Sequence, residues 1–553
     1  MGRDAFLRQL SSRQFEVLII GGGIVGAGIA RDAAMRGLKA ALVEQGDFGS
    51  GTSSKTSKLI HGGLRYLEQG RLRLVFESLR ERAILRRIAA GSVHPRSLLL
   101  PVYEGDARPA WKIHAGLWLY DLLAVGRNLP ACADGAAGRR THRWLSARRA
   151  LALEPSLRVD GLRAAGLYAD CQMDDARVCL ANVLQAAGFG AVVGNYLRVR
   201  TLLSADGQVC GALVEDVLTG RMVEIHARVV VNATGPWADD LRRLSDPDAP
   251  RRLAPTKGIH LILPRLAQEA LFVQSRADGR MLFILPWDGY SLVGTTESSV
   301  HESPEALRPE PDEVGYLLAE VNRVLPGSHA ADRDVIAAFA GARPLLAHAG
   351  SAATASREHR IEIDRRGLVS VMGGKFTTYR LMAEQTVDLL VRRHRWKEER
   401  CLTDQVSLME DVQPVSLERW HALVQAIDPD LLARWLVRYG AGTFRLLDAL
   451  DHDPSLAQPV CPHHEYAQAE LVHAIRHELA CTLTDVLARR TRIAWSPCHG
   501  LDALPVVIGL FQRYGGTLAQ PMEQQVEAYH QFLAQHRGSR RPHPVAAAAT
   551  VSS

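Results

Sequence analysis

A glycine pattern near the N-terminus restricts the fold of this chain more than any other feature. Residues 15–20 form a continuous apolar run, which is typical of a parallel strand buried on both faces. The run leads into a Gly-x-Gly-x-x-Gly pattern, residues 21–26 (GGGIVG), that opens a helix. In this context the pattern predicts a βαβ unit that binds a dinucleotide.

Each glycine of the pattern has a mechanical role. Gly21 permits a tight turn, Gly23 lets backbone N–H groups approach a pyrophosphate, and Gly26 lets the helix pack closely on the strand. The helix N-terminus offers donors and a positive dipole end to phosphates. Glu44 follows a second apolar run, residues 40–43, where a carboxylate binds ribose hydroxyls and disfavours a 2′-phosphate. NAD and FAD share this phosphate geometry, so the segment alone leaves both open.

Two later segments favour FAD. Residues 229–235 (VVVNATG) form a buried strand that enters a turn of small residues, and residues 371–378 (VMGGKFTT) combine a strand, paired glycines and a helix start. The dipole of that helix would stabilise negative charge on a reduced flavin ring. Three separated backbone contacts suit the long, extended FAD better than NAD.

Length and composition are those of a soluble multidomain protein. The 553 residues suggest roughly three to four structural units, and 47% hydrophobic with 23% charged residues excludes collagen-like and disordered classes. The net charge of +6 favours anionic partners. We find no secretory signal and no run of ~18 apolar residues, which predicts a cytosolic chain without a spanning helix. The eight cysteines show no Cys-x-x-Cys pair, so we expect no metal site.

The order of the patterns predicts an α/β region followed by helices. Residues 209–226 resemble a β-hairpin, and residues 379–393 begin a region rich in Leu, Ala, Glu and Arg. We therefore expect an oxidoreductase region over residues 1–390 and a helical C-terminal cap domain over 391–537. Residues 538–553 have almost nothing to bury and are predicted to be disordered.

Six segments together carry a family resemblance. They are residues 57–68 (SKLIHGGLRYLE), 233–238 (ATGPWA), 255–260 (PTKGIH), 292–297 (LVGTTE), 341–345 (GARPL) and 373–380 (GGKFTTYR). Over nearly its whole length the chain resembles the FAD-dependent, respiratory glycerol-3-phosphate dehydrogenases. The family pattern has leucine where Phe376 stands, a hydrophobic exchange that we expect to leave the site unchanged.

The resemblance implies a glutathione-reductase-like FAD-binding Rossmann domain with an interleaved, sheet-rich substrate domain. The FAD domain would lie mainly in residues 15–100, 165–250 and 340–390, and the substrate domain in 100–165 and 250–340. The implied cofactor contacts are Gly21, Gly22, Gly23, Gly26, Glu44, Thr52, Ser53, Ser57, Lys58, Ala233, Thr234, Gly235, Gly374, Lys375, Phe376 and Thr377.

The implied reaction is the oxidation of sn-glycerol 3-phosphate to dihydroxyacetone phosphate by hydride transfer from C2 to flavin N5. Electrons would pass to a membrane quinone. The resemblance thus implies a homodimer in the cytoplasm, bound peripherally to the cytoplasmic face of the inner membrane, with no nucleic acid partner.

A pocket for a phosphate ester needs several cationic donors, and arginine suits bidentate contacts. The candidate substrate residues are Arg65, Tyr66, Arg343, Arg357 and Lys375. A structural ion pair is the competing interpretation for Arg65 and Lys375. For Arg357, which lies in a more variable stretch, the competing interpretation is a surface salt bridge.

The reaction also needs a base for the C2 hydroxyl proton. The candidate catalytic residues are His260, His61 and Arg343. His260 is the favoured base, because histidine titrates near neutral pH and this one opens a strand in a family-like motif. His61, next to paired glycines, is the competitor, and each imidazole has a purely structural alternative.

Two segments are candidates for membrane contact. Residues 71–87 place Leu72, Val75 and Phe76 at helical spacing among arginines, the pattern of a basic interfacial helix. A scaffold helix with a solvated arginine face is the favoured interpretation. Residues 111–123 supply aromatic side chains. Attachment through cations would weaken at high salt.

Four other functions stay open. An amine or amino-acid oxidase of the same fold would need only one arginine for a carboxylate, and an oxygen-using glycerol-3-phosphate oxidase would release hydrogen peroxide. A flavoprotein that binds RNA would also suit the positive charge, with residues 71–87 as the contact. A non-catalytic FAD-binding module would show no substrate-dependent flavin reduction.

Overall fold

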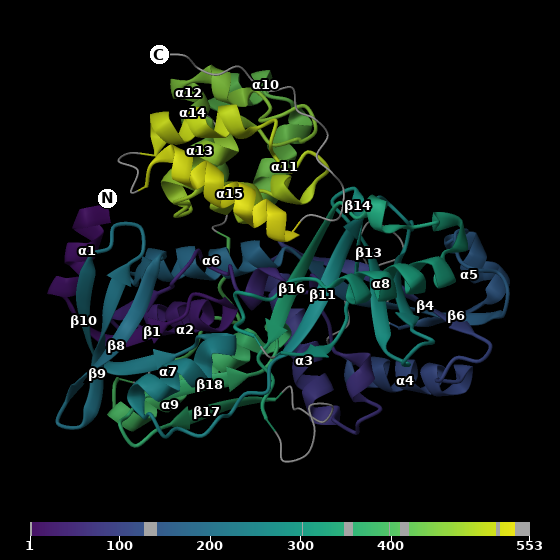
Figure 1. Cartoon of the computed structure of the whole chain (residues 1–553), viewed down its shortest axis with the longest axis horizontal. Coiled ribbons are helices and arrows are strands. Elements are labelled where there is room, and N and C mark those ends of the chain that lie inside the picture. Colours follow the sequence, from purple (N-terminus) through teal and green to yellow (C-terminus); the bar gives the residue numbers. More distant parts are fainter. Residues whose placement is uncertain are drawn as a thin grey trace.

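Two β-sheets and a C-terminal group of helices make up the described part of the chain (Figure 1). The computed structural model describes residues 3–125, 141–300, 302–347, 358–397, 399–409, 420–515 and 520–536. In Figure 1 the first sheet lies on the left, the second on the right, and the C-terminal helices lie above both. Within the described ranges no helix combines the length and the apolar character needed to cross a bilayer.

The first sheet contains the strand that leads into the glycine pattern. Its strands are β17 (His359–Ile363), β18 (Val369–Gly373), β10 (Met222–Asn232), β1 (Gln14–Ile20), β2 (Ala40–Val43) and β7 (Val192–Gly194), in this order, with β8 (Leu197–Ala205) and β9 (Gln208–Asp216) joined through β10. β1 runs parallel to β2 and β10, and Ile20 lies beside Val43 and Asn232. These strands therefore end at one edge of the sheet, where Gly21, Glu44 and Ala233 follow.

The second sheet contains the strand that carries His260. Its strands are β15 (Ser298–Ser299), β11 (Thr256–Leu263), β14 (Tyr290–Gly294), β13 (Met281–Trp287), β12 (Ala270–Gln274), β4 (Val93–Tyr103), β6 (Leu162–Met173) and β3 (Leu59–Ile60), in this order. β16 (Ala337–Arg343) pairs with β11, and β5 (Arg143–Ser146) pairs with β6. β11 is buried along its whole length, and its pairing with β16 sets His260 beside Phe339.

The strands β3, β4 and β6 join the second sheet, although most of their residues fall in the ranges expected for the FAD domain. The long antiparallel pairing of β4 with β6 decides this, since it runs from Val93 opposite Met173 to Tyr103 opposite Leu162. An apolar strand pattern shows that a strand is buried, and it carries no information about which sheet the strand joins.

Three helices cover the first sheet next to the glycine turn. α2 (Ile24–Met35) packs against α6 (Asp175–Gly188) and α9 (Tyr379–His394), and all three contribute to one apolar core with β1 and β10. The other helices before the C-terminal group are α1 (Arg3–Ser12) and α7 (Ala238–Ser245), which contact the first sheet, and α3 (Leu72–Ile88), α4 (Ala110–Leu123), α5 (Ala147–Leu153) and α8 (Pro311–Val324), which contact the second. The expected strands at residues 15–20 and 40–43, and the expected helix at residues 379–393, are confirmed.

The C-terminal helices have an apolar core of their own. They are α10 (His421–Ala426), α11 (Pro429–Tyr439), α12 (Thr443–His452), α13 (Gln468–His477), α14 (Leu504–Tyr514) and α15 (Met522–His536). Their helical nature is as the sequence predicts. The expected disordered tail, residues 538–553, lies outside the described residues.

Ion pairs attach the C-terminal helices to the loops that follow strands of both sheets. Arg490 donates two hydrogen bonds to the Asp47 carboxylate, at 2.7 and 2.8 Å, and Arg489 donates to the same group. Arg492 pairs with Asp174 at 2.9 Å. Burial alone would raise the pKa of Asp47, but the charges of the two arginines outweigh it and lower the pKa to about 2.

Candidate active site

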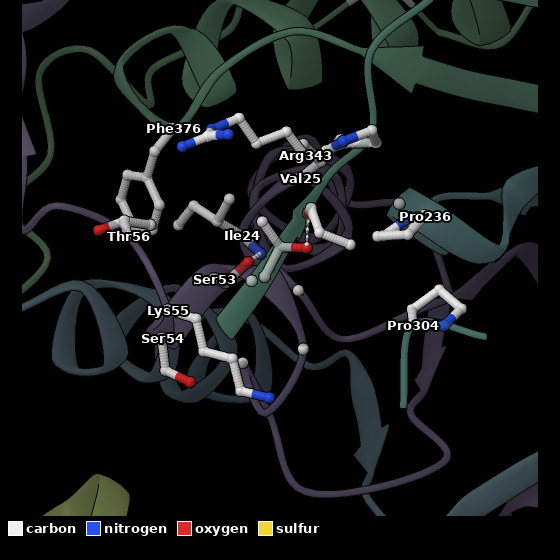
Figure 2. A pocket seen from close by; sticks show the side chains of 18 of the residues that line it. Ile24, Val25, Ser53, Ser54, Lys55, Thr56, Pro236, Pro304, Arg343 and Phe376 are labelled. Carbon is white, nitrogen blue, oxygen red and sulfur yellow. Dashed lines mark hydrogen bonds between the residues drawn. The ribbon is translucent and has the colours of Figure 1, made fainter. Parts of the chain in front are cut away.

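The separated glycine segments meet at one cavity of about 820 Å³. Side chains from α2, from the loop after β2, from the end of β16 and from the segment before α9 surround it in Figure 2. The expected site residues that line the cavity are Gly21, Gly23, Glu44, Thr52, Ser53, Ser57, His61, Arg65, Tyr66, Ala233, Thr234, Gly235, His260, Arg343, Gly374, Lys375, Phe376 and Thr377. A cavity of this size lies in the usual range for small-molecule and cofactor sites, roughly 300–1,000 Å³.

The first glycine turn is too tight for side chains. Gly21 has φ +107°, and a Cβ atom on it would lie 2.6 Å from the carbonyl oxygen of Ala233. A Cβ atom on Gly26 would lie 1.8 Å from the carbonyl oxygen of Gly21, so the helix can approach the strand only with glycine there. This is the mechanical role that the sequence predicts for Gly26, which lies behind the cavity wall. Because these turn positions carry no side chains, the N-terminus of α2 is accessible from the cavity.

Glu44 directly follows β2, and its side chain is partly buried at the cavity wall. One carboxylate oxygen accepts a 2.7 Å hydrogen bond from the N–H of Gly22, and the other accepts a 2.9 Å bond from Gly46. Burial raises the pKa of Glu44. These bonds fix an acceptor where the sequence predicts a ribose contact, one residue past the strand end that borders the glycine turn.

These residues fit FAD. A Cβ atom on Gly374, at φ +79°, would meet the side chain of Met382 at 2.4 Å, so the far end of the cavity also has a turn that excludes side chains. The short helix Phe376–Thr378 follows and leads into α9, which places a helix start at the wall. A helix start, a carboxylate placed for a ribose and backbone turns therefore line one cavity, which are the groups that a dinucleotide needs.

His260 is a buried imidazole on the wall of the cavity. Its Nε2 atom lies 2.8 Å from the hydroxyl oxygen of Ser57, and its ring stacks on Phe339 with centroids 5.1 Å apart. Burial, then the charges of Arg343 and Lys58, lower its pKa well below the ordinary value of 6.5. The ring is therefore neutral at physiological pH, which is the form that can accept a proton.

His61 lines the same cavity from the loop that follows β3. Its ring meets Phe283 edge to face at 6.3 Å. The next residue, Gly62, donates a 2.8 Å hydrogen bond to the hydroxyl of Tyr120, which in turn donates to Asp170 at 2.7 Å. This buried network holds the loop in place, so both candidate bases are rigidly positioned.

Three expected cationic residues share the cavity. Arg343 donates to the Thr295 hydroxyl at 2.8 Å and to the Thr296 carbonyl at 3.0 Å, which fixes the direction of its guanidinium. The ammonium of Lys375 lies 4.6 Å from the centre of the Tyr66 ring. Arg65 lines the cavity one residue before Tyr66. The cavity wall therefore carries these three cations and the two imidazoles, and Arg343 is near enough to His260 to lower its pKa.

Three of the expected site residues lie elsewhere. Gly22 and Gly26 lie behind the cavity wall, and the ammonium of Lys58 pairs with Asp175 at 2.6 Å. That pair is buried, so Lys58 acts on the cavity through its charge on His260. Arg357 lies outside the described residues.

The C-terminal helices complete the cavity wall, which the sequence did not reveal. Arg489, Trp495, Phe532, Gln535 and His536 all line it. Their spacing is ordinary for a helical domain and gives no signal of a site. Lys55 also lines the cavity, and burial, then the charge of Arg489, lowers its pKa to about 8. Its position between Ser53 and Ser57, both expected contacts, is a signal that could have identified it.

The comparisons with known proteins agree with this geometry. A family model described as FAD dependent oxidoreductase matches residues 16–389, and one described as the C-terminal domain of alpha-glycerophosphate oxidase matches residues 401–518. The glycerol-3-phosphate dehydrogenase of Synechocystis is 34% identical over 96% of this chain and 98% of its own length. The chain belongs to the family of FAD-dependent glycerol-3-phosphate dehydrogenases.

Other members of this family are similar over most of their length. The aerobic glycerol-3-phosphate dehydrogenase of Bacillus subtilis is 35% identical over 88% of this chain and 89% of its own. The structure of the Bacillus halodurans glycerol-3-phosphate dehydrogenase, complexed with FAD, is 28% identical, with a TM-score of 0.76 over 96% of each chain. The predicted fold class, family and FAD cofactor are thereby confirmed.

Proposed function

We propose that this chain oxidises sn-glycerol 3-phosphate to dihydroxyacetone phosphate and passes the electrons to a membrane quinone. One observation carries the proposal: three cationic residues and two imidazoles line the same cavity as the glycine turns that fit FAD. When bound, FAD supplies the acceptor for the hydride that leaves C2. The relatives named as glycerol-3-phosphate dehydrogenases support the choice of substrate.

The charge of the cavity supports a phosphate ester over a carboxylate substrate. A phosphate monoester carries nearly two negative charges and needs several cationic partners, whereas the single carboxylate of an amino-acid substrate needs one arginine. Arg65, Arg343 and Lys375 together match the larger charge. In this proposal Arg343 binds the phosphate or the C2 oxygen with its oriented guanidinium, and Tyr66 holds Lys375 in place.

His260 is the proposed base. Taking the proton of the C2 hydroxyl leaves alkoxide character on that oxygen, which lowers the barrier to hydride loss from C2. The neutral imidazole is fixed by Ser57 and Phe339, and its Nδ1 atom has no hydrogen-bond partner among the described residues. It therefore has the capacity to receive one proton in each turnover.

The first prediction tests the substrate. Under anaerobic conditions, glycerol 3-phosphate is expected to bleach the absorbance of the oxidised flavin in the purified protein. Glycerol should not, because it gives the cations nothing to bind. The measurement is stopped-flow absorbance with both compounds at equal concentration. Bleaching by amino acids, or by no phosphorylated polyol, would overturn the proposal.

The electron acceptor separates two related functions. The second family model takes its description from an alpha-glycerophosphate oxidase, which supports oxygen as the alternative acceptor. Stoichiometric hydrogen peroxide during turnover in air would identify that function, and fast reduction of a soluble quinone analogue would support the dehydrogenase. The expected homodimer can be tested separately, by measuring the molar mass in solution with light scattering. If the chain were an RNA-binding flavoprotein, it would be retained on immobilised RNA at physiological salt.

A quinone acceptor requires contact with the bilayer, and α3 and α4 offer an apolar surface for it. Trp111, Trp118 and Leu122 on α4 are 72%, 60% and 66% exposed, and Leu72 and Phe76 on the adjoining α3 are also exposed. The rest of the apolar stripe on α3, including Val75 and Leu79, is buried. α3 is thus mainly a scaffold helix, and α4 presents the larger exposed apolar surface.

The second prediction tests this surface. The double variant Trp111→Ser, Trp118→Ser is expected to bind vesicles that contain anionic lipid about tenfold more weakly, since each exposed indole loses its apolar burial. Co-sedimentation at low and high salt measures the binding, which should also fall with salt. Met222→Ser is the matched control, because Met222 is exposed on β10 in the other sheet. Equal binding by the parent protein and both variants would contradict the proposal that this surface contacts the membrane.

A further inference from the structure

Two cysteines and a histidine meet in the C-terminal helical domain, apart from the cavity. The ligand atoms of Cys461, His464 and Cys498 all lie within 4.8 Å of one another. Cys461 is buried, and the other two are partly buried. The expectation that the chain has no metal site rests on sequence spacing, which cannot reveal a set split between segments 34 residues apart.

The histidine nitrogen faces the cysteine across the gap. The Nε2 atom of His464 lies 3.7 Å from the Cys498 sulfur and 2.8 Å from the hydroxyl oxygen of Ser496. Ligand atoms of a tetrahedral zinc site, with bonds of 2.0–2.3 Å, lie roughly 3.3–3.8 Å apart. The distance between His464 and Cys498 therefore matches two ligands of one ion.

The backbone on both sides of the cluster is fixed. Residues 459–467 form a loop closed by a bridge between Pro459 and Ala467, and within it the N–H of His464 lies 3.4 Å from the carbonyl oxygen of Cys461. In the second segment the N–H of Leu501 donates to the carbonyl of Cys498 at 3.0 Å. Two turns, on either side of α13 in the chain, thus bring the three side chains to one point.

We propose that Cys461, His464 and Cys498 bind one Zn²⁺ ion that joins these two loops. Two sulfurs and one imidazole nitrogen favour zinc over magnesium, calcium or manganese, which prefer oxygen ligands. Asp502, four residues after Cys498 and with its carboxylate 3.5 Å from the Nε2 atom of His463, is the candidate for the fourth position. The site is structural, because its ligands do not line the cavity.

The position of the ion gives it a consequence for the active site. Cys498 lies three residues after Trp495, which lines the cavity and packs edge to face on Phe339 at 5.7 Å. Arg492, which pairs with Asp174 and Asp288, begins the same segment. Zinc would therefore hold the segment that joins the C-terminal helices to both sheets.

The zinc content of the full-length, FAD-loaded protein tests the proposal. The protein is purified without a polyhistidine tag, and metal is measured by mass spectrometry of the digested sample. We expect roughly one zinc per chain in the parent protein and less than about a tenth of that in Cys461→Ser and in Cys498→Ser. Cys210→Ser, at a free cysteine on β9, is the control and should keep the metal. Zinc-free parent protein, or full zinc in both cluster variants, would overturn the site.

Two measurements on the parent protein alone cover the case in which the variants do not fold. Protein produced with Co²⁺ should show the absorption of tetrahedral cobalt in the red, where oxidised flavin does not absorb. Digestion without reduction should release Cys461 and Cys498 in separate peptides. A cross-linked pair would identify a disulfide at this position and would contradict the zinc site, whatever the result for substrate oxidation.

Discussion

Replacing His260 with glutamine is expected to slow reduction of the bound flavin by glycerol 3-phosphate about 10²- to 10⁴-fold. Glutamine can keep a hydrogen bond to Ser57, which lies 2.8 Å from the Nε2 atom of His260, but it cannot accept the C2 hydroxyl proton. The rate is measured by anaerobic stopped-flow absorbance. Bound FAD, measured by its absorbance after release, should stay unchanged.

His61→Gln is the matched control, because His61 lines the same cavity and undergoes the same change. The loss in that variant should be much smaller if His260 is the base. The opposite order of the two losses would assign the proton transfer to His61.

The dependence on pH follows from the neutral state of His260. Burial and the charge of Arg343 lower its pKa, and a base works in its neutral form, so kcat/KM should fall only as the pH drops well below 6.5. A bound phosphate dianion offsets the charge of Arg343 and raises this pKa. The acidic limb of kcat should therefore lie at higher pH than that of kcat/KM, and it should disappear in His260→Gln.

Replacing Asp47 with asparagine is expected to destabilise the docked C-terminal helices by on the order of 3–5 kcal/mol. The change leaves the buried guanidinium of Arg490 without its bidentate partner and weakens the pairing of Arg489. Calorimetry and limited proteolysis of the FAD-loaded protein measure the effect. We expect the C-terminal helices of this variant to unfold at a lower temperature than in the parent protein.

Asp246→Asn provides the control for a lost charge at the surface. Asp246 pairs with Arg365, whose side chain is 73% exposed, so the loss of stability should be about 0–1 kcal/mol.

The carboxyl pKa of Asp47 is lowered from 3.8 to about 2. Its contribution to stability is therefore complete above the unfolded pKa and is lost as the pH falls toward 2. Equal stability of both variants would contradict a docking role for Asp47.

The sequence was sufficient for the parts of the site that depend on local rules. Gly21 and Gly26 could be interpreted because a tight turn and a close helix approach permit no other residue. Glu44 followed from its place at the end of a parallel strand. His260 and Arg343 came from a family resemblance, and the pairing of β11 with β16 brings their strands together.

Long-range packing explains what the sequence did not reveal. The pairing of β4 with β6 and the approach of α15 to β16 join segments far apart in the chain, and no local pattern specifies either. The same holds for the meeting of Cys461 with Cys498. Trp495 and His536 could not be assigned to the cavity, since their role depends on where a separate apolar core docks.

The aromatic contacts between the second sheet and the C-terminal helices have a consequence for biosynthesis. The ring of Phe339, which stacks on His260, is covered by Trp495, and Trp495 in turn packs against Phe532. These covering residues leave the ribosome more than 150 residues after Phe339. The part of the cavity wall that the C-terminal helices supply is therefore synthesised after both sheets, and the wall is complete only when the last helix has been made.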